Sequence, residues 1–73
     1  MAGSRDIEKV YARGEFAAKL RRLADAIENE EPFTIQVAGV RFTVPADAEI
    51  SVEHEKGDDE EELEFQLRWT PRS

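Results

Sequence analysis

Hydrophobic and polar residues alternate without a break along the last part of the chain. Between positions 61 and 69 the apolar residues occupy every second position, and these are Leu63, Phe65, Leu67 and Trp69. The residues between them are polar, namely Glu62, Glu64, Gln66 and Arg68. A period of two over this length is typical of a β-strand with one face on a core and one face in water. The pattern predicts a closing strand and its buried face.

Two shorter segments upstream alternate in the same way and predict a hairpin. Residues 33–37 and 40–44 flank Ala38-Gly39, and a two-residue turn there would place six apolar residues on one face. The expected apolar pairs are Phe33 with Val44, Ile35 with Phe42, and Val37 with Val40. The expected polar pairs on the other face are Thr34 with Thr43 and Gln36 with Arg41.

Residues 48–55 alternate as well and can pair with the closing strand across the polar loop 56–61. The register that keeps apolar residues together pairs His54 with Leu63, Val52 with Phe65, Ile50 with Leu67, and Ala48 with Trp69. A slip by one residue would place apolar residues opposite polar ones throughout. The same register brings Glu53 opposite Glu64 and Glu55 opposite Glu62 on the polar face.

The period changes to that of a helix between residues 15 and 29. One stripe of a 3.6-residue helix collects Phe16, Ala17, Leu20, Leu23, Ala24 and Ile27. We expect Gly14 at the N-cap and an end before Pro32, because the residue preceding a proline is disfavoured in the α region. The weaker alternation of residues 6–12 leaves a short first strand open.

These elements predict an α+β domain. We expect one amphipathic helix packed on one face of a four- to five-stranded antiparallel sheet, in the order (β)αββββ. Residues 1–5 would be a loose tail, residues 6–70 the domain, and residues 71–73 a second tail. A helix about 22 Å long cannot cover the whole apolar face of such a sheet. We expect an uncovered patch, and such patches mark interfaces with a second copy or another protein.

The composition narrows the classes of function. The chain of 73 residues has no cysteine, one histidine, 17 acidic and 10 basic residues, and a net charge of −7. This charge disfavours nucleic acids and anionic membranes as partners. No apolar run spans a bilayer or suggests a signal peptide, so a cytoplasmic protein is expected. An acidic protein with few lysines also suits a cytoplasm of high salt. The sequence does not decide whether habitat or function is the cause of this acidity.

Candidate chemistry is sparse, and neither catalysis nor a cofactor, metal or small-molecule substrate is expected. His54 is expected to be half-buried at the edge of the core, and the cluster Lys19, Arg21 and Arg22 to form a solvated helix face. The carboxylates lack the spacing of a calcium-binding loop, although their crowding also suits weak binding of divalent cations or of a basic partner. Trp69 is expected to anchor the core or an interface. The candidate interaction residues are Trp69, Leu67, Phe65, Glu53, Glu55, Glu62 and Glu64.

The helical segment Leu20-Arg21-Arg22-Leu23-Ala24-Asp25-Ala26-Ile27, the break Val44-Pro45-Ala46-Asp47 and the amphipathic strand ending in Trp69 together resemble the Amphi-Trp domain family. The resemblance runs from about residue 6 to residue 69 and rests on patterns, with residues 70–73 as an extra tail. It implies a small stand-alone prokaryotic domain without an assigned activity, and it implies no catalytic residues. We therefore expect a non-catalytic module for protein interaction or self-assembly. An acidic surface for a basic partner or divalent cations is the alternative.

Overall fold

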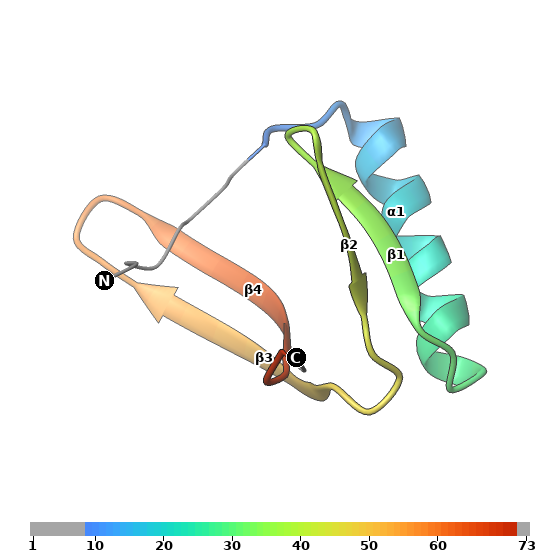
Figure 1. The fold of residues 1–73 in the computed structure, drawn as a ribbon. Helices are drawn as coiled ribbons and strands as arrows, with labels where there is room; N and C mark the ends of the chain where they lie inside the picture. Colours follow the sequence, from blue (N-terminus) through green and yellow to red (C-terminus); the bar gives the residue numbers. More distant parts are fainter. Residues whose placement is uncertain (1–8, 72–73) are drawn as a thin grey trace, which may run out of the picture.

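The computed structural model of the chain describes residues 9–71 and contains one helix followed by four antiparallel strands (Figure 1). The elements are α1 (Arg13–Glu28), β1 (Phe33–Val37), β2 (Val40–Val44), β3 (Glu49–Lys56) and β4 (Glu61–Arg68). The predicted α+β class and the antiparallel pairing are therefore confirmed. Residues 9–12 form no strand, and the rest of the suggested first strand lies outside the described residues.

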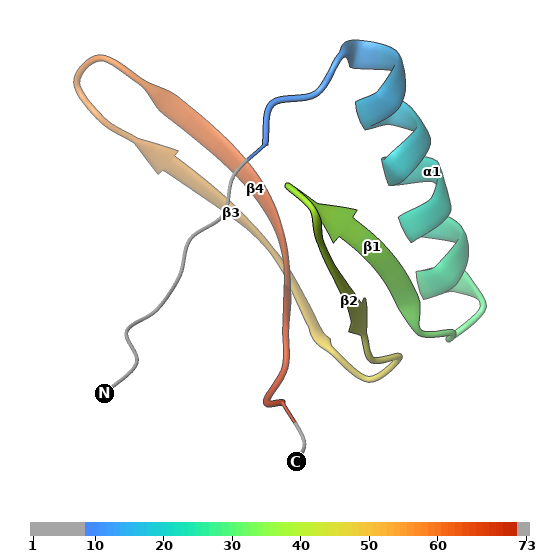
Figure 2. The same cartoon turned by 45° about the horizontal axis from the view of Figure 1, so that its top comes forward.

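The strands form two separate two-stranded sheets, β1–β2 and β3–β4, where a single sheet was expected. The break lies at Pro45, which has no backbone N–H to donate to a neighbouring strand. The Ala48 N–H donates to the Pro45 carbonyl at 3.2 Å and closes a turn that redirects the chain. As a result, the β3–β4 hairpin diverges from β1–β2 toward its tip, which both views show (Figures 1 and 2).

The register within each hairpin is as the alternation predicts. Phe33, Ile35 and Val37 lie opposite Val44, Phe42 and Val40 in the first hairpin. Ile50, Val52 and His54 lie opposite Leu67, Phe65 and Leu63 in the second hairpin. Ala38 and Gly39 form the first turn with positive φ angles of 49° and 84°, which is the type I′ geometry that matches the twist of a hairpin.

Helix α1 begins two residues earlier than the sequence indicates and ends at Glu28, before Pro32 as expected. The Phe16 N–H donates to the Ala12 carbonyl at 3.0 Å, so Gly14 lies inside the first turn and the prediction of an N-cap there is wrong. At the other end, Glu31 N–H donates to Ala26 O at 2.9 Å and Glu30 N–H to Ile27 O at 3.1 Å. With Glu30 at a φ of 55°, these two bonds form a Schellman motif.

The core lies where α1, β1–β2 and the base of β3–β4 meet. Among the described residues, Ala26, Phe33 and Val44 are buried. Partly buried side chains surround them, namely Leu23, Ile35, Ala48, Leu67 and Trp69. Arg22 ties the helix to β1 by donating to the Thr34 carbonyl at 2.9 Å, with its guanidinium 5.1 Å from the centre of the Phe33 ring. Within residues 9–71, no helix has both the length and the apolar character needed to span a bilayer.

Candidate interaction surface

The apolar face of the β3–β4 hairpin is largely exposed. Four neighbouring side chains on it, which we call the hairpin face, are Ile50, Val52, Leu63 and Phe65, exposed by 58, 62, 66 and 64%. The expectation of one continuous dry face is therefore wrong for this part of the strands. Only the end of the hairpin next to β2 reaches the core, because the hairpin diverges from the other elements toward its tip.

Helix α1 carries a second exposed apolar stripe, consisting of Phe16, Leu20 and Ile27 at 55, 42 and 42% exposure. A groove of about 280 Å³ separates α1 from the hairpin, with Leu23 and Ile27 on the helix side and Val52 and Phe65 among the hairpin residues that line it. The helix and the hairpin thus face each other through apolar side chains without closing on each other. The uncovered patch expected from the helix length is present.

Trp69 connects the hairpin to the first sheet. Its ring stacks on that of Phe42 in β2, with centroids 6.4 Å apart and an interplanar angle of 23°. Leu67 and Trp69 are half-buried and pack against the core cluster, whereas Phe65 is exposed. The three apolar candidates therefore divide into two that anchor the hairpin and one that lies on its bare face.

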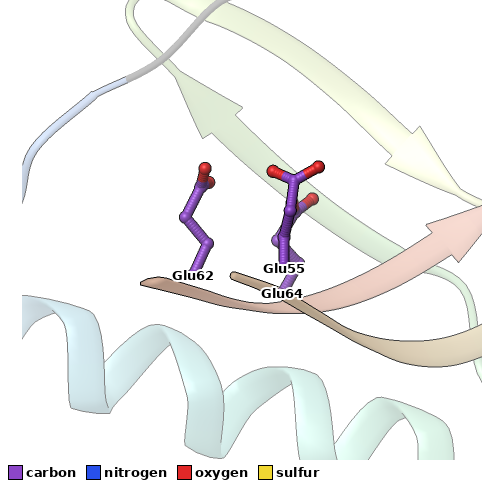
Figure 3. Close-up of side chains that lie close together, drawn as sticks. All are labelled: Glu55, Glu62 and Glu64. Atoms are coloured by element: carbon purple, nitrogen blue, oxygen red, sulfur yellow. The ribbon is translucent and has the colours of Figure 1, made fainter. Parts of the chain in front are cut away.

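The polar face of the hairpin gathers carboxylates. Glu55 lies opposite Glu62 and Glu53 opposite Glu64, as the register predicts. Oxygen atoms of Glu55, Glu62 and Glu64 lie within 4.8 Å of one another, and the three side chains project from the side of the hairpin away from α1 (Figure 3). The negative charge of Glu55, followed by that of Glu64, raises the pKa of the exposed Glu62 carboxyl. Such an all-oxygen cluster resembles the ligand sets of hard cations such as Ca²⁺.

Gln66 relieves part of this crowding and was not singled out from the sequence. Its Nε2 donates to Glu53 Oε1 at 2.8 Å and to Glu64 Oε2 at 3.2 Å. Ser51 Oγ donates to Gln66 Oε1 at 3.4 Å and completes the chain of contacts. The position of Gln66 on the same face, two residues after Glu64, is the signal that could have identified it.

The remaining candidates have local partners. His54 is not half-buried as expected, since its side chain is 62% exposed and its Nε2 lies 2.9 Å from Glu61 Oε2. The predicted basic cluster is divided, because Arg22 is engaged with β1 and the Lys19 ammonium lies 5.1 Å from the centre of the Tyr11 ring. Tyr11 also donates to the Gln36 carbonyl at 3.4 Å.

The negative charge is concentrated in one hairpin. Residues 49–68 contain nine acidic and two basic side chains, a net charge of −7, and the other residues of the chain sum to zero. Helix α1 itself contains four basic and three acidic residues. The molecule therefore has an acidic hairpin with one bare apolar face, beside a nearly neutral helix with an apolar stripe.

Comparison with known proteins connects this arrangement to a family. The family model for the Amphi-Trp domain matches residues 4–73. The chain belongs to the Amphi-Trp domain family. No curated protein and no solved structure matches it. The resemblance noted from the helix, the proline break and the closing strand is thus confirmed, and in this Amphi-Trp domain the terminal tryptophan of that strand stacks on Phe42.

Proposed function

We propose that this Amphi-Trp domain is a non-catalytic protein-interaction module that binds through the hairpin face. The observation that supports this function is the exposure of Ile50, Val52, Leu63 and Phe65, which are adjacent on two paired strands. At about 100 Å² each, they present roughly 400 Å² of contiguous apolar surface, which is the size at which patches on soluble proteins are often functional.

The polar groups of the described residues support binding over catalysis. The sole histidine lies on an exposed strand beside Glu61, and no serine or threonine hydroxyl within residues 9–71 hydrogen-bonds to it. Nucleophilic catalysis requires a base that contacts a nucleophile and is oriented by a third group. The groove between α1 and the hairpin is lined mainly by apolar side chains, which suit the burial of another apolar surface.

Site-specific photo-crosslinking in the cells that produce the protein tests this function. A benzophenone amino acid at Val52 is expected to yield covalent protein adducts, because Val52 lies on the hairpin face. The same amino acid at Ser51, on the opposite face of β3, serves as the matched control and is expected to yield few. A folded protein that yields no adducts from either Val52 or Phe65 would refute the proposal.

The carboxylate face supports a second candidate function, the binding of a basic partner or of divalent cations. The supporting observation is the approach of the Glu55, Glu62 and Glu64 oxygens to within 4.8 Å. Adducts formed at Ser51 but not at Val52, and weakened steeply by salt, would favour a basic partner. Shifts of the Glu62 and Glu64 carboxyl resonances on adding Ca²⁺, with the Glu64 shift lost in Glu62→Gln, would favour a cation.

A further inference from the structure

We propose that the partner of the hairpin face is a second copy of this chain, and that the hairpin face of each copy lies on the apolar stripe of α1 in the other. This inference rests on the proposed function and names the occupant of that surface. Each copy has both halves of the contact, namely four bare apolar side chains on the hairpin and three on the helix. A two-fold axis would pair both halves at once and close the assembly as a dimer.

The exposed area matches what a stable dimer buries. The seven side chains of the two surfaces are 42–66% exposed and together present about 700 Å², close to the roughly 800 Å² per partner of a standard interface. The total accessible surface is 6719 Å² for a mass of 8.3 kDa. A compact monomer of that mass exposes about 4,600 Å². The surface of this chain is therefore larger than that of a compact monomer of the same mass.

Within one chain, the helix and the hairpin already approach each other through apolar side chains. At the base of the groove, Leu23 of α1 and Leu67 of the hairpin pack against the same core cluster. Farther along, the two elements leave the apolar side chains of both bare. An isolated two-stranded hairpin is marginally stable in water, so a cover on this part of β3–β4 would stabilise it. Contact with a second copy would cover the apolar side chains that both elements leave exposed.

The charge distribution favours the helix over the second hairpin as the surface that receives the hairpin face. Pairing of the two hairpins would bring two segments of charge −7 together, whereas α1 has a net charge of +1. On a helix of 100° per residue, Arg13 falls beside the stripe. The carboxylates of Glu55 and Glu62 project from the opposite face of the hairpin, so covering the hairpin face leaves them in water.

Solution mass and paired variants test the dimer. Light scattering of the purified chain over a range of concentrations, at low and high salt, is expected to approach twice the mass of 8.3 kDa. Phe65→Ser and Leu20→Ser, one on each surface, are each expected to weaken the dimer at least tenfold. Ser51→Ala, on the polar face of β3, is expected to leave it unchanged. A wild-type chain that stays monomeric at every concentration would overturn the inference.

Crosslinking determines which surfaces meet and does not depend on destabilising variants. The chain has no cysteine, so Leu63→Cys can be mixed with either Phe16→Cys or Ile27→Cys and treated with a short bismaleimide. We expect crosslinked dimers in at least one of the two mixtures. We expect few crosslinks between two copies of Leu63→Cys. Dominant joining of Leu63→Cys to itself, or no joining in either mixture, would overturn the arrangement.

The same reagents separate this inference from the proposed function. In a chain with both Phe16→Cys and Leu63→Cys, a crosslink within one monomer would show that the groove closes on itself and would overturn the dimer. Photo-adducts at Val52 with the mass of other proteins, on a monomeric chain, would overturn the dimer and leave the interaction function standing. Absence of all adducts would overturn both.

Discussion

Trp69→Ala perturbs the contact that attaches the hairpin to the rest of the domain. Trp69 is half-buried, packs against the core cluster and stacks on Phe42 at a centroid distance of 6.4 Å. Removal of its ring should weaken the junction between the two sheets, since no strand pairing joins β1–β2 to β3–β4. We therefore expect a loss of stability larger than a surface aromatic would give.

The loss can be worked from the area that the ring covers. A tryptophan removes up to about 200 Å² from water when buried, and a half-buried ring removes roughly 120 Å². At about 25 cal/mol per Å², this corresponds to about 3 kcal/mol as an upper value. A domain of 73 residues has a free energy of unfolding of about 4–11 kcal/mol, so Trp69→Ala should remove a large share of it. The stacked pair should contribute about 1 kcal/mol beyond area burial.

A double-mutant cycle with Phe42→Ala measures that pair. Urea unfolding is followed by far-ultraviolet circular dichroism, because Trp69 is the sole tryptophan and its fluorescence is lost in the variant. All four proteins are compared at one concentration at which the chain is monomeric. The double variant should be less destabilised than the sum of the single variants by about 1 kcal/mol. Additivity within about 0.3 kcal/mol would refute the contact. Unchanged stability with a weakened dimer would instead make Trp69 an interface anchor.

Three further predictions concern backbone conformation and charge. Ala38→Asn should stabilise the domain by about 0.5–1 kcal/mol, seen as a higher urea midpoint, because Ala38 has a φ of 49° in a type I′ turn. Glu30→Gly should stabilise the domain by about 1 kcal/mol, because Glu30 has a φ of 55° that glycine adopts without strain. Glu30→Gln should raise the stability by only about 0.3 kcal/mol, which comes from removing a negative charge at the C-terminal end of the helix. Because Glu55 raises the pKa of Glu62 above its ordinary 4.5, ionisation of Glu62 lowers stability as pH rises through and above that value. Glu62→Gln should therefore stabilise the protein near pH 7 and not at about pH 3.5, and an equal gain at both values would contradict the repulsion.

The sequence predicts the pairing within each hairpin better than the relation between the hairpins. Period-two alternation determines which residues share a face, and a turn as short as Ala38-Gly39 determines which residues lie opposite each other. Whether β2 pairs with β3 depends on the path of the chain after Pro45, and no pattern of apolar residues encodes that path. The N-cap is assigned wrongly to Gly14 for a similar reason. The Ala12 carbonyl accepts the first helical hydrogen bond, and no side-chain cap marks this position in the sequence.

The apolar face of β4 is partly buried and partly exposed, which explains why the sequence locates this face but not the surface that packs on it. The face is continuous in sequence, yet Leu67 and Trp69 pack on the core while Leu63 and Phe65, on the same side of the strand, are bare. Alternation is identical for a face covered by its own chain and for one covered by a second chain, because both exclude water equally. Whether the face is covered by its own chain depends on the direction in which the hairpin extends, and the packing of Leu67 and Trp69 on the core determines that direction. If a second copy covers the bare part, folding and association are coupled, and the midpoint of unfolding should rise with protein concentration. The anchor at Trp69 would then orient the hairpin for its partner as well as join it to the core.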